Sequence, residues 1–157
     1  MLKSKIRNKL LKTRKNSNKK NIKIKFDKIY KLLKKTTNLR NKIVGGYYPV
    51  NYEIDDLDIL GRLEKKKITI SLPSIKKNYK MNFIKCSLNA PFVLNQYGIP
   101  EPSSGTIVNP DILLVPLVAF DRNLNRLGYG AGYYDRTIES LKKKKKIITI
   151  GLAFDFQ

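Results

Sequence analysis

The sequence of 157 residues contains no histidine, no tryptophan and a single cysteine, Cys86. One cysteine cannot form an internal disulfide, and without histidine or a cysteine cluster a zinc site of the usual kind is excluded. No apolar run approaches the roughly 20 residues that cross a bilayer. The basic N-terminus also has no uninterrupted apolar stretch of the signal-peptide type. These absences predict a cytoplasmic protein in a reducing compartment.

Acidic residues are scarce as well, 12 against 33 basic residues, which gives a formal net charge of +21. Such an excess is typical of nucleic-acid-binding proteins. The charge is uneven, because residues 1–42 hold 17 basic residues and one acid, whereas residues 89–139 hold three arginines and five acids. Lysine, asparagine and isoleucine are abundant and share A/T-rich codons. We therefore favour solvated surface lysine over a dedicated nucleic-acid face.

The apolar residues make up 41% of the chain, enough for one core, and their spacing predicts alternating helices and strands. Helices are predicted at residues 2–15, 26–37, 55–63 and 135–141. Strands are predicted at residues 43–48, 68–72, 81–86, 111–120 and 147–153, with residues 89–109 as a loop. This alternation predicts a single α/β domain in which helices cover a mostly parallel sheet.

Three of these elements carry more specific predictions. Leu2, Ile6 and Leu10 recur at intervals of four and predict an amphipathic first helix. The apolar run DILLVPLVAF at residues 111–120 is typical of a central strand buried on both faces, with Pro116 marking a bulge or the end of the strand. Residues 147–153 are expected to form a last buried strand.

The segment RLGYGAGYYDR, residues 126–136, follows the buried strand, and ligands of α/β proteins usually bind at such a position. Its three alternating glycines leave backbone amides open to phosphate oxygens. Arg126 can add a bidentate contact, and Asp135 suits Mg²⁺. The spacing matches neither common nucleotide motif. From the loop alone, the alternative of a purely structural glycine-rich turn, with Tyr133 and Tyr134 in the core, therefore stays open.

With its flanks, PDILLVPLVAFDRNLNRLGYGAGYYDR resembles the signature of the 5-formyltetrahydrofolate cyclo-ligase family, in which a buried strand ending in P-x-x-A-F-D precedes R-L-G-x-G-x-G-Y-Y-D. Further matches follow in order along most of the chain: KSKIR, YYPVNYEID, ITISLPSI, MNFIKC, YGIPEP and IGLAFDFQ. The resemblance implies a three-layer α/β/α domain over residues 1–157. It also implies an enzyme that uses ATP and Mg²⁺ to convert 5-formyltetrahydrofolate to 5,10-methenyltetrahydrofolate, with release of ADP and phosphate.

Carried over by position, the resemblance assigns roles to individual residues. Lys3 and Arg7 would meet the nucleotide phosphates, and Tyr48 and Glu53 would line the folate pocket. The ATP loop would comprise Arg126, Leu127, Gly128, Tyr129, Gly130, Ala131, Gly132, Tyr133 and Tyr134, and its residues 129–133 would also touch folate. Arg126 and Tyr133 would act in catalysis, and Asp135 would be a Mg²⁺ ligand.

Family members run some tens of residues past the segment that IGLAFDFQ matches, through a final strand and a second acidic metal-binding position. We therefore expect a C-terminally short domain whose sheet lacks an edge strand. The expected partners are ATP and 5-formyltetrahydrofolate, with or without a polyglutamate tail, and neither a membrane nor a nucleic acid. Two alternatives stay open: a basic nucleic-acid-binding module, and a shortened relative that binds ligand without turnover.

Overall fold

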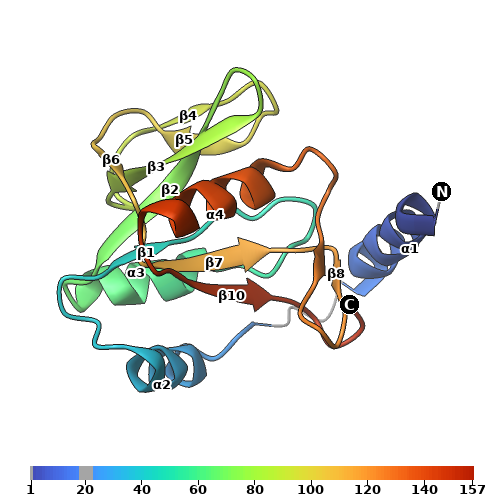
Figure 1. Ribbon diagram of the computed structural model, residues 1–157, viewed down its shortest axis with the longest axis horizontal. Coiled ribbons are helices and arrows are strands. Elements are labelled where there is room, and N and C mark those ends of the chain that lie inside the picture. Colours follow the sequence, from blue (N-terminus) through green and yellow to red (C-terminus); the bar gives the residue numbers. More distant parts are fainter. Residues whose placement is uncertain (1, 18–22) are drawn as a thin grey trace.

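The computed structural model describes residues 2–17 and 23–157, in which four helices surround a six-stranded sheet (Figure 1). The helices are α1 (Leu2–Ser17), α2 (Phe26–Thr36), α3 (Leu57–Lys65) and α4 (Tyr133–Lys144). Across the sheet the strands are β10 (Ile148–Leu152), β7 (Ile112–Pro116), β1 (Ile43–Gly45), β2 (Thr69–Lys76), β3 (Lys80–Cys86) and β6 (Ile107–Val108). Three of the five strand pairs are parallel, and the two that involve β3 are antiparallel.

Strand β7 lies between two hydrophobic clusters, one on each face of the sheet. All five of its residues are buried, as the apolar run predicted. Because successive side chains point to opposite faces, Ile112 and Leu114 pack with the core side chains of α2 and α3, whereas Leu113 and Val115 pack with Leu141 of α4. Helices therefore cover both faces, and the predicted three-layer α/β/α architecture is confirmed (Figure 1).

Two strand predictions are wrong in detail. Strand β10 is not buried on both faces, because within the described residues it pairs only with β7 and its first four residues alternate between half-buried and exposed, although Leu152 is buried. The predicted loop at residues 89–109 contains β6 and a hairpin of β4 (Phe92–Leu94) and β5 (Pro100–Pro102). These pairings span only two or three residues, and the prolines in β5 are tolerated at a sheet edge, so the sequence pattern did not indicate strands.

Helix α1 forms as predicted, but its apolar spacing does not describe how it packs. Leu2 and Ile6 are 73% and 39% exposed, and the buried residue of α1 is Arg14. The helix lies beyond the carboxyl ends of β7 and β10, beside the short hairpin of β8 (Ala119–Phe120) and β9 (Arg126–Leu127) (Figure 1). It contacts the rest of the protein there through arginine side chains, as described below.

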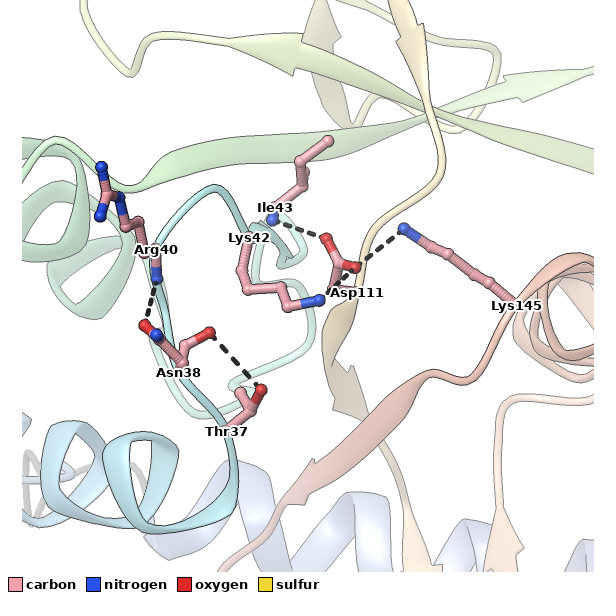
Figure 2. A network of polar contacts seen from close by, with 7 residues as sticks. All are labelled: Thr37, Asn38, Arg40, Lys42, Ile43, Asp111 and Lys145. Atoms are coloured by element: carbon pink, nitrogen blue, oxygen red, sulfur yellow. Dashed lines mark hydrogen bonds and ion pairs between the residues drawn. The ribbon is translucent and has the colours of Figure 1, made fainter.

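Asp111 connects three elements at the opposite ends of the parallel strands (Figure 2). One carboxylate oxygen accepts the Ile43 amide of β1 at 2.9 Å, and the other accepts the ammonium groups of Lys42 at 3.3 Å and Lys145 at 3.1 Å. Asp111 immediately precedes β7, and Lys145 ends α4. This single side chain therefore fixes the starts of β1 and β7 relative to the end of α4.

Partial burial raises the pKa of Asp111, but the Ile43 amide and the two lysines outweigh it and lower the pKa below the ordinary value. The folded chain thus holds this proton less tightly than the unfolded chain, in which the pKa is about 3.9. The stabilisation is complete above the unfolded pKa and is lost as the pH falls through the lower, folded pKa.

Replacing Asp111 by Asn keeps the side-chain shape but removes the charge that both lysines contact. We expect a loss of about 1–3 kcal/mol in the free energy of unfolding at neutral pH, measured by urea denaturation, and a much smaller loss in acid. Asp58→Asn is the control, because its pair with Arg62 is exposed and is worth at most about 1 kcal/mol. A difference between wild type and Asp111→Asn that stayed constant with pH would contradict the assignment.

No helix in residues 2–17 or 23–157 is both long enough and apolar enough to cross a membrane.

Candidate active site

One cavity of about 570 Å³ opens at the carboxyl ends of β1 and β7. Pro116 ends β7 at its wall, and Tyr47 and Tyr48 enter it shortly after β1. Every residue that the sequence analysis assigned to the site lines this cavity, namely Lys3, Arg7, Tyr48, Glu53 and the continuous segment Arg126–Asp135. The assigned residues come from three separate parts of the chain and meet at the place where α/β sheets usually bind ligands.

At two positions of the glycine loop, the backbone has a conformation that only glycine adopts without strain. Gly130 has φ 111° and Gly132 has φ 72°, both in the region that L-residues avoid. Gly132 also precedes the first turn of α4, which explains why the helix begins at Tyr133 rather than at the predicted residue 135. The loop thus leads directly into a helix N-terminus, where backbone amides and the helix dipole favour an anion.

Helix α1 lies directly against this loop. Arg7 donates a hydrogen bond from Nε to the Gly128 carbonyl at 2.9 Å, and its guanidinium lies 3.6 Å from the position of a Cβ on Gly130. Lys3, one turn earlier, also lines the cavity. Two cationic side chains of α1 therefore stand beside the open amides of the loop.

Arg126 and Asp135 form an ion pair across the two ends of the loop, with Nη2 and Oδ1 2.5 Å apart. The Arg126 guanidinium also lies over the Tyr134 ring, 5.6 Å from its centroid. The Arg126 side chain is 18% exposed, whereas that of Asp135 is 69% exposed. The pair fixes the direction of Arg126 and leaves Asp135 accessible from the cavity.

The two adjacent tyrosines take different positions. Tyr134 packs against both core clusters, as the alternative of a structural turn predicted, and burial raises the pKa of its hydroxyl. Tyr133 packs against only the cluster that contains Leu141, and where it lines the cavity its ring also packs against those of Tyr79 and Tyr97. The structural interpretation of this motif is therefore confirmed for Tyr134, and ligand binding by the two tyrosines, which both line the cavity, stays a prediction.

The opposite wall of the cavity carries a buried carboxylate. Glu53 accepts the Val50 amide at 2.8 Å through Oε2, while Oε1 is buried and has no hydrogen-bond partner. Burial raises the pKa of Glu53, and the hydrogen bond from the Val50 amide, the nearby Tyr129 hydroxyl and the positive charge of Arg14 only partly oppose the rise. A buried acceptor without a partner is costly, so Oε1 is suited to accept a hydrogen bond from a ligand.

Sequence reasoning missed several residues of the site. The β4–β5 hairpin contributes Tyr97 and Ile99, and Glu101 holds that hairpin against β2 by accepting the Ser74 hydroxyl and the Ile75 amide. The segment YGIPEP had indicated this region but not its role. Arg14 was missed entirely, because nothing in a lysine-rich helix distinguishes one buried arginine.

The described residues offer only a partial site for a metal ion. Within residues 2–17 and 23–157, no group of three or more histidine, cysteine or acidic side chains could hold one. Asp135 is an accessible carboxylate of the cavity, already paired with Arg126. Because Mg²⁺ keeps several waters and takes one or two carboxylates with substrate phosphates, Asp135 fits a single ligand of a nucleotide-bound Mg²⁺.

The sequence profile of the 5-formyltetrahydrofolate cyclo-ligase family matches residues 1–157. The chain belongs to this family. A 5-formyltetrahydrofolate cyclo-ligase of Haemophilus influenzae is 34% identical over 124 residues, which are 74% of this chain and 65% of that protein. Its counterpart in Mycoplasma genitalium is 35% identical over 115 residues, 71% of this chain and 58% of that protein. The chain thus spans less than two thirds of the length of these relatives.

Solved structures of cyclo-ligase relatives have the same fold. The NMR structure of Aquifex aeolicus 5,10-methenyltetrahydrofolate synthetase aligns with all of this chain and 80% of that one, at a TM-score of 0.78 and 32% identity. A 5,10-methenyltetrahydrofolate synthetase from Mycoplasma pneumoniae aligns at a TM-score of 0.62 and 23% identity, over 98% and 90% of the two chains. The α/β/α architecture is therefore that of the cyclo-ligase family.

The positive φ of Gly130 in the glycine loop predicts that adding a methyl group there lowers the stability of the protein. Gly130→Ala should lower the free energy of unfolding by about 1–3 kcal/mol, because its φ of 111° is strained for alanine although space is available. Gly61→Ala in α3 should instead be neutral or stabilising, since a Cβ there would meet only Leu88 at 3.4 Å. Urea denaturation of both variants checks this, and equal effects would contradict it.

Proposed function

We propose that this protein catalyses the ATP- and Mg²⁺-dependent conversion of 5-formyltetrahydrofolate to 5,10-methenyltetrahydrofolate, with release of ADP and phosphate. One observation carries the proposal beyond family membership. A single cavity joins the glycine loop and the cations of α1 on one side to a buried carboxylate on the other, one oxygen of which has no hydrogen-bond partner. Such a cavity suits the two substrates of this reaction, since one is a polyphosphate and the other carries a ring rich in hydrogen-bond donors.

The chemistry needs positioning more than it needs a strong protein base. The N-formyl group is an amide, whose oxygen is a poor leaving group until the γ-phosphoryl of ATP is transferred to it and ADP departs. The second folate nitrogen then attacks the formyl carbon, the ring closes, and the oxygen leaves as phosphate. The protein contributes mainly orientation and stabilisation of phosphate charge, so a site without histidine is sufficient.

We assign the nucleotide to the loop side of the cavity. The amides of the glycine loop would bind phosphate oxygens, and Lys3, Arg7 and Arg126 would neutralise their charge. Arg126 is held over Tyr134 by Asp135, so it is positioned before the nucleotide arrives. Tyr133, which lines the cavity, would contact both substrates where the phosphoryl group is transferred.

Folate would occupy the opposite wall. The free oxygen of Glu53 would accept a hydrogen bond from the donor-rich pterin-like ring, and Tyr48 would pack beside it. Residues 129–133 would then contact folate from the loop side. Asp135 would hold Mg²⁺ together with phosphate oxygens and water, and the ion would offset charge on the transferred phosphoryl group. A polyglutamate tail, where present, would meet the basic surface around the cavity.

The first test measures turnover. The protein is incubated with 5-formyltetrahydrofolate, ATP and Mg²⁺, and the methenyl product is followed by its absorbance. We expect product that depends on all three components. A folded sample that forms no product at any protein concentration would contradict the proposal, and thermal shifts with each ligand would then distinguish a protein that binds without turnover from one that binds neither substrate.

The proposed metal ligand has a matched control. Asp135→Asn should lower kcat/KM on the order of 10²-fold and raise the Mg²⁺ concentration needed for half-maximal rate. Asp58→Asn removes an exposed carboxylate that also pairs with an arginine, at 3.1 Å, but lies outside the cavity. Activity should be unchanged in that control. An unaltered Mg²⁺ dependence in Asp135→Asn would remove Asp135 from the metal site.

Charge on α1 is testable in the same way. Arg7→Gln should raise the KM for ATP about tenfold or more with a smaller effect on the KM for folate, because a charged phosphate contact is lost. Lys9→Gln removes an exposed charge from the same helix and should leave both KM values within about twofold, since Lys9 does not line the cavity. Equal effects of the two changes would indicate a general charge effect instead.

A further inference from the structure

Arg14 is the largest side chain that is almost completely buried, with 2% of its surface exposed. It donates hydrogen bonds from Nη1 to the Tyr129 hydroxyl at 2.8 Å and from Nη2 to the Leu117 carbonyl at 2.5 Å. Nε is buried without a hydrogen-bond partner. Among the described residues, no carboxylate forms an ion pair with this guanidinium.

Burying a cation that has no ion-pair partner costs stability, and an apolar side chain of similar volume would avoid that cost. The two acceptors explain what the guanidinium does instead. Leu117 follows the last residue of β7, and Tyr129 lies between two glycines of the loop. A planar guanidinium can hold both acceptors in a fixed geometry, which a lysine ammonium at the end of a flexible chain cannot do.

The Tyr129 hydroxyl is also the group through which Arg14 reaches the folate side of the cavity. It accepts a hydrogen bond from Arg14, and it lies close enough to the Glu53 carboxyl group to affect the pKa of that group. Arg14 itself does not line the cavity, whereas Tyr129 and Glu53 both do. A continuous chain of contacts therefore runs from the sheet through Arg14 and Tyr129 to the opposite wall.

We propose that Arg14 is a positioning residue, which holds Tyr129 between the nucleotide loop and Glu53 and seats α1, with Lys3 and Arg7, against that loop. The expected effect of Arg14 on turnover rests on the proposed function. Its role in holding Tyr129 and α1 in place rests only on the hydrogen bonds to Tyr129 and Leu117. Without Arg14, the loop and the carboxylate wall would lose their common support, and α1 would lose its hydrogen bonds to the Leu117 carbonyl and the Tyr129 hydroxyl.

Two conservative variants test the arrangement. Arg14→Lys keeps the charge but loses the planar guanidinium. Tyr129→Phe removes only the hydroxyl that accepts the hydrogen bond from Arg14. Each should lower kcat/KM by about ten- to a hundredfold, as expected for losing a hydrogen bond to a charged group. The kcat/KM of the double variant should be no lower than that of the less active single variant, because both changes break the same contact between Arg14 and Tyr129. Multiplicative effects in the double variant would overturn the proposal.

Hydrogen exchange provides a readout that needs neither substrate. In Arg14→Lys and Tyr129→Phe, the amides of α1 and of Val118, which bonds to the Leu127 carbonyl, should exchange about tenfold faster than in wild type. Lys12→Gln, an exposed change on the same helix, should leave them unchanged. Unchanged exchange in both test variants would overturn the proposal even if wild type proved to have no turnover, so the two hypotheses fail separately.

If Arg14→Lys does not fold, Tyr129→Phe alone carries the test, because it removes one oxygen at a partly exposed position. A purely structural arginine predicts that Tyr129→Phe keeps wild-type kinetics and wild-type exchange in α1. A positioning arginine predicts that both change.

Discussion

The burial of β7 on both faces is the constraint on which the site depends. A one-residue shift of this strand would move Ile112 and Leu114 out of one core and into the other, so its register is fixed. The points where the strand begins and ends are fixed as a result. Asp111 at the beginning holds β1 and α4, and the Pro116–Leu117 end supports the cavity and receives Arg14. The loop can therefore be rich in glycine and still have a defined position.

Arginine and lysine have separate functions in this chain, although both contribute to its charge of +21. Four arginines surround the loop, and each contacts a defined acceptor: Arg7 with Gly128, Arg14 with Tyr129, Arg126 with Asp135 and Arg136 with Ala131. The lysines are mostly exposed. Because a guanidinium fixes geometry while an ammonium acts mainly as a point charge, the distribution of arginine locates the site better than the total charge does.

The sequence predicted those parts of the fold in which a local pattern decides the structure. Within the apolar run at residues 111–120, Ile112–Pro116 form the buried strand, which ends at Pro116, while Ala119–Phe120 belong to a separate hairpin, and the alternating glycines form a loop. Patterns failed where distant parts of the chain decide burial. Leu2 and Ile6 have helical spacing but are exposed, while Arg14 is buried because Tyr129 and Leu117 accept its hydrogen bonds. The position of β10 at the edge also depends on its neighbours rather than on its apolar residues.

The candidate residues that the family resemblance named all line one cavity, yet the resemblance could not indicate how the two walls differ. One wall presents the glycine loop, which leads into the N-terminus of α4, with the cations of Arg7 and Arg126, and the other presents the buried acceptor of Glu53. A polyphosphate placed against Glu53 would meet a like charge, and a donor-rich ring placed against the loop would face other donors. Each wrong arrangement leaves polar groups unpaired, so the two walls discriminate by repulsion as much as by attraction. On the proposed function, the cavity would thereby determine both which ligands bind and how they face each other.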